Sequence, residues 1–117
     1  MKWKREIFNR CILPLVIYGS QTWSLTKLQE NKLHSWQHGI ERCTTGIRKC
    51  DRIRSSSIRE ITGMEDVVAA ARRLKWKWAG HVARMSNDRW AKIATEWVPY
   101  GSKRRRGRQR KRWAEPM

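Results

Sequence analysis

Residues 65–85 read EDVVAAARRLKWKWAGHVARM, and this stretch decides the fold class of the chain. Its acidic pair stands at the start, where carboxylates favour the positive end of a helix dipole. Its apolar residues recur at helical spacing and fall on one arc. We therefore predict one long amphipathic helix ending near residue 85, with a buried face made of Val67, Ala71, Leu74, Trp78, Val82 and Met85.

Two further helices are predicted upstream of this stretch. Residues 4–18 carry apolar side chains at near-helical spacing, and Pro14 is expected to kink or split this helix. Thr26 and Gln29 form a capping-box signal, which starts a second helix over about residues 27–43, and Gly46 is a plausible stop. Between them, residues 17–25 are expected to form a short strand or turn. The apolar positions are Ile7, Cys11, Leu15 and Tyr18 in the first helix, and Leu33, Trp36, Ile40 and Cys43 in the second.

Two short helices complete the expected fold. Serines at 55–57, followed by a short apolar stretch and a glycine, indicate a helix of two turns. Asp88 is expected to cap a last helix with an apolar stripe of Trp90, Ile93, Ala94 and Trp97. Beyond Pro99 no hydrophobic periodicity remains. We predict an all-α fold: a small bundle of about four to five helices over residues 1–98, followed by a disordered basic arm over residues 99–117.

The charge balance indicates a polyanionic partner. The chain has 117 residues, with 27 Lys and Arg against 10 Asp and Glu, and a formal net charge of +17. Self-repulsion on this scale disfavours a compact state unless a polyanion is present, and such cations pair with nucleic-acid phosphates. We therefore expect RNA or DNA as the partner. Eight tryptophans are many for so small a core, so some of them are expected on the surface.

Membrane and secreted classes are not supported by the sequence. No apolar stretch reaches the length of a membrane span, so no membrane partner is expected. The three cysteines cannot all pair within one chain, which is typical of a reducing compartment. The basic arm is compatible with nuclear import, so we expect a nuclear location, with the cytoplasm left open.

The candidate ligands for nucleic acid are cations with indoles among them. On the long helix they are Arg72, Arg73, Lys75, Trp76, Lys77 and Arg84. Trp76 lies on the cationic side of this helix, and two interpretations stay open for it: stacking on a base, or burial inside a larger protein. Eight of the ten positions from 103 to 112 are Lys or Arg, and the forked guanidinium of Arg clamps phosphate. The ligands in the arm are Lys103, Arg104, Arg105, Arg106, Arg108, Arg110, Lys111, Arg112 and Trp113.

Metal binding and catalysis are not expected. The metal-capable groups near the second helix are His34, His38, Cys43 and Cys50, whose spacing matches no compact zinc template. We expect both histidines on a solvated face beside Glu30 and Glu41. His81 lies on the apolar arc of the long helix and is expected to be a packed core histidine. No paired-Asp motif or phosphate-binding glycine loop is present, so we expect neither an enzyme nor a cofactor.

Three ordered motifs resemble one family. They are YGSQTWSLT (residues 18–26), RLKWKWAGHVARM (residues 73–85) and RGRQRKRW (residues 106–113). Together they resemble the C-terminal region of LINE-type (non-LTR) retrotransposon reverse transcriptases, beyond the polymerase palm. Gln21 and Gln109 stand where that family usually has Glu and Pro, and the Tyr-Ala-Asp-Asp metal site of the palm is absent. The resemblance implies thumb and post-thumb helices of an RNA-directed DNA polymerase with an endonuclease, without the catalytic centre.

The sequence therefore predicts a non-catalytic fragment that binds RNA or DNA through backbone phosphates, with some stacking. Two alternatives stay open. One is a protein-interaction remnant whose exposed tryptophans packed on the missing palm domain. The other is a degenerate transposon-derived reading frame without an independent function.

Overall fold

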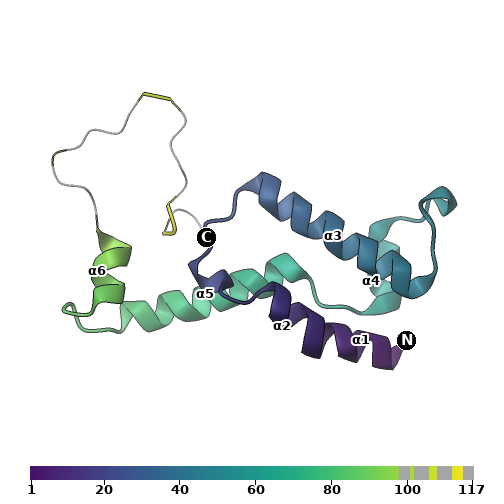
Figure 1. The fold of residues 1–117 in the computed structure, drawn as a ribbon, viewed down its shortest axis with the longest axis horizontal. Coiled ribbons are helices and arrows are strands. Elements are labelled where there is room, and N and C mark those ends of the chain that lie inside the picture. Colours follow the sequence, from purple (N-terminus) through teal and green to yellow (C-terminus); the bar gives the residue numbers. More distant parts are fainter. Residues whose placement is uncertain (98–100, 102–105, 108–111, 115–117) are drawn as a thin grey trace.

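The described part of the protein is all-α in the computed structural model, as expected, and forms a small helical bundle (Figure 1). The structure describes residues 1–97, 101, 106–107 and 112–114. The predicted boundary after residue 98 and most of the predicted arm lie outside these residues. The α-helices are α1 (Lys2–Ile7), α2 (Leu13–Val16), α3 (Lys27–Thr45), α4 (Ser55–Thr62), α5 (Val67–Ala83) and α6 (Trp90–Glu96). Short 3-10 turns occupy Ser20–Thr22 and Lys49–Asp51.

The first two helices are joined by a π turn over Phe8–Ile12, just before Pro14. In a regular α-helix the ring of a proline crowds the carbonyl four residues back, and wider turns occur where a helix is disrupted. Phe8 and Leu13, five residues apart, are both buried because the wider turn keeps them on one side. The expected disruption is confirmed, but the apolar spacing identified the outward face: Ile7, Cys11, Leu15 and Tyr18 are all exposed.

Helix α3 begins and ends where the sequence predicts. The Thr26 amide donates to Gln29 Oε1 at 2.8 Å, and the Gln29 amide donates to Thr26 Oγ1 at 3.4 Å. Gly46 ends the helix in the left-handed region, with φ 75°. The buried side chains of α3 are nevertheless polar: Glu30, Gln37 and Glu41. The predicted apolar face is confirmed only in part: Leu33 and Ile40 are half-buried and pack against the core, whereas Trp36 and Cys43 are exposed.

The polar face of α3 holds the connection between α4 and α5. The Gln37 side-chain amide donates to the Glu65 carbonyl at 2.8 Å, and its oxygen accepts from the Val67 amide at 2.9 Å. The Glu65 amide donates to Asn9 Oδ1 at 3.2 Å. Asp66 caps α5 by accepting from the Ala69 amide at 2.9 Å. A buried backbone group without a partner costs free energy, so these side chains determine where α5 begins.

The core lies where α5 crosses the first helices. Its buried members are Phe8, Leu13, Ile17, Met64, Val67, Val68, Ala70 and Ala71. We call residues 67–73 the buried half of α5 and residues 74–83 its exposed half. Figure 1 shows the exposed half projecting from the region of α1 to α4 toward α6. All eight tryptophans belong to the described residues, and none of them is buried.

Helix α6 forms as predicted but is capped differently. Its N-cap is Arg89, which makes no side-chain capping bond. Asp88 is not the cap: its carboxylate accepts a hydrogen bond from the Ser86 side chain, which lowers the pKa of Asp88. All four residues of the predicted apolar stripe are exposed, and the neighbouring Ala91 is half-buried. Trp90, for example, is 83% exposed.

Candidate nucleic-acid interface

The exposed half of α5 combines an accessible indole with unpaired cations. Trp76 is 56% exposed, and Lys77 and Arg84 are exposed nearby. Within the described part of the chain, no carboxylate forms an ion pair with Lys77 or Arg84. Among the described residues, no carboxylate therefore neutralises these two charges, which can pair with a ligand.

Two of the predicted phosphate ligands form ion pairs inside the fold. Arg72 Nη2 lies 2.5 Å from Glu30 Oε1, and Arg73 Nη1 lies 2.5 Å from Glu65 Oε1. Burial raises the pKa of Glu30, but the hydrogen bond and positive charge of Arg72, together with Lys27, outweigh it and lower this pKa. As nucleic-acid ligands, Arg72 and Arg73 remain predictions, and binding phosphate would require them to share or exchange their carboxylates.

The structure brings Lys75 together with Trp113 from the end of the chain. Lys75 Nζ lies 5.2 Å from the centroid of the Trp113 ring, within the range of a cation–π contact. The indole N–H of Trp113 donates to the Gln21 carbonyl at 2.6 Å. Figure 1 shows residues 112–114 as a short yellow segment close to α5. Trp113 is thereby attached to the helix that carries the other predicted ligands.

A hollow of about 360 Å³ lies along the exposed half of α5. Trp78 and His81 line it, with their ring centroids 5.4 Å apart. His81 is exposed, so the prediction of a packed core histidine is wrong. The physical reason is that the buried position in this turn of α5 is taken by the neighbouring Val82. The remaining lining residues are Gln21, Leu74, Lys77 and Arg84.

A larger hollow of about 810 Å³ shares Trp78 with the first. We call it the tryptophan hollow because Trp78, Trp97 and Trp113 all line it. These indoles come from α5, from the residue that follows α6 and from the end of the chain. The other lining residues are Thr22, Ala94, Thr95, Glu96, Arg112 and Ala114.

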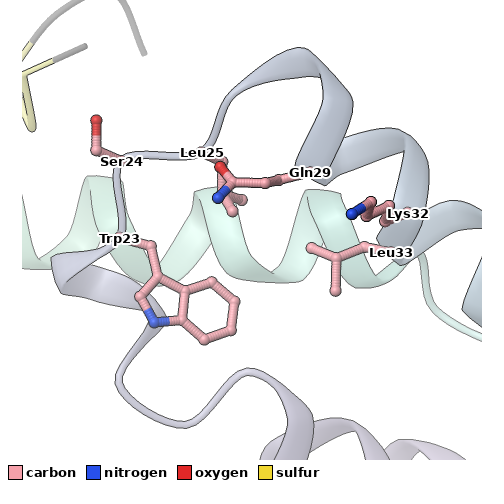
Figure 2. A pocket seen from close by; sticks show the side chains of 6 residues that line it. All are labelled: Trp23, Ser24, Leu25, Gln29, Lys32 and Leu33. Carbon is pink, nitrogen blue, oxygen red and sulfur yellow. The ribbon is translucent and has the colours of Figure 1, made fainter. Parts of the chain in front are cut away.

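A third hollow, of about 480 Å³, lies at the start of α3. Figure 2 shows the Trp23 indole and the Leu33 side chain on opposite sides of it, with Gln29 and Lys32 from α3. Leu25 and Ser24 complete the lining. Lys32 is the single cation among the described residues that line it, so this part of the surface differs in charge from that of α5.

The predicted ligands in the arm are only partly described. Arg106 and Arg112 are exposed, and Trp113 is half-buried. The predicted ligands Lys103, Arg104, Arg105, Arg108, Arg110 and Lys111 lie outside the described residues.

The histidines of α3 belong to a polar cluster, not to a solvated face. Glu41 is fully buried and accepts from Arg59 Nε at 2.9 Å, while His38 Nδ1 lies 3.2 Å from its other oxygen. His34 Nδ1 lies 3.4 Å from Asp66, which also pairs with Arg59 at 2.5 Å. The predicted solvated face beside Glu30 and Glu41 is therefore wrong, because both carboxylates are buried and the histidines are half-buried.

The polar cluster has a structural role in joining α3, α4 and α5. Burial raises the pKa of Asp66, but the Ala69 amide and the charges of Arg59 and His34 lower it more. Cys43 and Cys50 are exposed. Within the described ranges, no group of three His, Cys, Asp or Glu residues is arranged to hold a metal ion.

Several residues of this surface were not predicted as ligands. Trp78 was assigned to the buried face, and Gln21 and Trp97 were given no binding role. The helical spacing around Trp78 predicts an apolar face, and Trp78 is half-buried, but the spacing does not show that this residue also lines a hollow. Gln21 and Trp97 join this surface only in the folded chain, where the Gln21 carbonyl accepts from Trp113 and Trp97 lines a hollow with Trp78.

Comparison with known proteins gives one informative similarity. The chain is 30% identical over 116 residues to a transposon-derived protein of Caenorhabditis elegans, a match covering 96% of this chain and 42% of that protein. The chain thus spans less than half the length of this relative. No protein-family profile matches the chain, and no solved structure matches it. The similarity supports a transposon origin for the chain.

No helix in the described part of the chain is long and apolar enough to cross a membrane.

Proposed function

We propose that this chain is a non-catalytic nucleic-acid-binding segment derived from the C-terminal region of a LINE-type (non-LTR) retrotransposon reverse transcriptase. Its partner is RNA or DNA, which it binds through the backbone phosphates. The three ordered motifs support the reverse-transcriptase part of this origin, and the transposon-derived relative supports its transposon part. A nuclear location, served by the Arg-rich arm, is part of the same proposal.

The observation that carries this proposal is the exposed half of α5. Lys77 on this half and Arg84 directly after it have no acidic partner in the described part of the chain, and both line a hollow with Trp78 and His81. Cations pair with phosphates, and aromatic rings offer stacking faces to bases. Arg112 and Trp113 bring the described end of the arm to the same helix.

A salt titration of binding tests the proposal. Each phosphate contact adds about 0.9 to the slope of log affinity against log salt for duplex, and about 0.7 for single strands. Removing the residues after Gly101 should lower this slope by several such steps. Deletion also removes Trp113, so a second variant replaces only Lys103, Arg104, Arg105 and Arg106 with Gln. An unchanged slope in both variants would remove the arm from the proposal.

Absence of catalysis is tested separately. A primer-extension assay on the purified chain with Mg²⁺, deoxynucleotides and an annealed RNA template should yield no product. Any extended primer that disappears when Mg²⁺ is chelated would overturn the non-catalytic part of the proposal.

A second candidate function is packing against another segment of a longer parent protein. The observation in its favour is the outward apolar face of α1 and α2, formed by exposed Ile7, Leu15 and Tyr18, with Trp3 at its start. Large exposed apolar patches mark protein interfaces. We expect the isolated chain to self-associate in sedimentation experiments, and Leu15→Lys to reduce this. A monomeric wild-type chain would count against this candidate.

The transposon-derived relative also fits a degenerate transposon remnant. Such a remnant can keep the inherited surface chemistry, so binding of oligonucleotides does not separate the two origins. Loss of binding altogether would favour the remnant.

A further inference from the structure

We infer that the tryptophan hollow is a stacking site for an unpaired nucleobase, so that the ligand of this chain is single-stranded RNA or DNA. This inference rests on the proposed function and specifies its ligand. It assigns a binding role to Trp78 and Trp97, to which the sequence gives none.

The aromatic lining is the first support. Three indoles from separate parts of the chain converge on one hollow of about 810 Å³. Ligand pockets typically measure about 300–1,000 Å³ and are lined by apolar and aromatic side chains. Trp97 is 65% exposed, so its ring contributes little to the core and offers a free surface.

The distribution of charge indicates a base inside the hollow and phosphates beside it. Among the described residues that line the hollow, the charge of Arg112 is matched by the carboxylate of Glu96. The adjoining hollow shares Trp78 and carries Lys77 and Arg84. A strand can therefore place its backbone along Lys77 and Arg84 while a neutral base enters between the indoles.

The contacts of Trp113 show that this site is partly preorganised. Its N–H is bonded to the Gln21 carbonyl, and Lys75 lies over its ring. These contacts orient the ring before a ligand arrives, which reduces the entropy lost on binding. The exposed indole of Trp97 then provides the face on which the base stacks.

The geometry selects single strands. In a duplex the faces of the bases are covered by their neighbours, whereas unpaired bases can stack on aromatic side chains. Stacking of a base on a protein aromatic ring contributes about 1–3 kcal/mol by alanine substitution. Since about 1.4 kcal/mol corresponds to tenfold in affinity, this equals a factor of roughly 5 to 150.

The test compares three fluorescent probes of equal length: an oligothymidine strand, an abasic strand with the same phosphates, and a duplex. We expect the oligothymidine strand to bind more tightly than the abasic strand by roughly 5- to 150-fold. Trp97→Ala should remove most of this difference by weakening only the oligothymidine complex. The matched control is Trp90→Ala, because this exposed indole lies at the start of α6, the helix that Trp97 follows, and is not among the residues that line the hollow.

The outcomes separate this inference from the proposed function. If oligothymidine and abasic strands bind equally and Trp97→Ala changes neither, the stacking site is overturned while phosphate binding stands. A preference for duplex would overturn the single-strand assignment in the same way. If none of the three probes binds even at low salt, the proposed function itself fails.

Discussion

The two halves of α5 belong to one continuous helix but have opposite surroundings. In the buried half, Val67, Val68, Ala70 and Ala71 are all buried. In the exposed half, Trp76 and Lys77 are exposed and Val82 alone is buried. Small side chains allow neighbouring helices to approach closely, whereas bulky indoles and cations need space. A single helix can therefore anchor itself at one end and present a binding surface at the other.

The acidic residues of the fold sharpen this difference. Glu30 and Glu65 pair with the two arginines at the end of the buried half, and Glu41 and Asp66 pair with Arg59 beside its start. Charge near the buried half is thus largely compensated by ion pairs, whereas Lys77 on the exposed half forms no ion pair with a carboxylate of the described residues. A carboxylate inside the fold and a phosphate compete for the same cation. We therefore expect the paired Arg72 to stabilise the fold and Lys77 to bind phosphate.

The largest expected effect comes from the core that holds the buried half. Phe8 is 1% exposed, so Phe8→Ala should lower the free energy of unfolding by about 3–5 kcal/mol through lost burial and a cavity. Trp76→Ala removes a larger ring from the exposed half and should change this free energy by only about 0.5 kcal/mol. Urea unfolding followed by circular dichroism compares the two. Equal losses would contradict the division of the helix.

A smaller loss is expected from Gln37→Leu. This change leaves the Glu65 carbonyl and the Val67 amide without their side-chain partner, at about 1–3 kcal/mol for each group that stays buried. The matched control is Lys32→Leu on the exposed side of the same helix, which should be nearly neutral. The rate of amide hydrogen exchange at the start of α5 should rise in Gln37→Leu and stay unchanged in Lys32→Leu.

Arg72→Gln and Lys77→Gln compare the two halves of α5 by their effects on nucleic-acid binding and on stability. Lys77→Gln should lower the salt slope of single-strand binding by about 0.7 without changing the urea midpoint. Arg72→Gln should lower the urea midpoint, because it leaves Glu30 buried with Lys27 alone, and should change the slope less. The reverse pattern would show that Arg72 binds phosphate in the complex.

The smallest expected effect is a loss of stability at acidic pH. The pKa values of Glu30 and Asp66 are lowered in the fold, from ordinary values of 4.5 and 3.8. Their stabilisation is complete above the unfolded values and is lost as pH falls through the lowered ones. Unfolding free energy should therefore decline below about pH 4.5. Arg72→Gln should flatten this decline and Lys77→Gln should leave it unchanged, as a pH series of urea titrations would show.

Helix positions were largely predictable because their signals are local. The capping box at Thr26, the left-handed Gly46 and Gly63, and the acidic start of α5 act within one turn of the chain. These residues determined where helices begin and end without knowledge of their neighbours. The cap of α6 was mispredicted because Ser86 competes for Asp88, and this competition is also local.

The amino-acid order by itself determined an all-α fold, its helices, and a strongly basic surface, since propensity, capping and net charge require no distant partner. Tertiary structure decided which face is buried in the first segment and in α3. On α5 the face predicted from the sequence is confirmed: Val67, Ala71 and Val82 are buried, and the other three members are half-buried. One extra residue in the π turn rotates the later part of the first segment, and Gln37 and Glu41 point inward because they bind groups on α4 and α5. It also decided that Trp78, Trp97 and Trp113 meet, because only folding brings positions so far apart in the chain to one hollow.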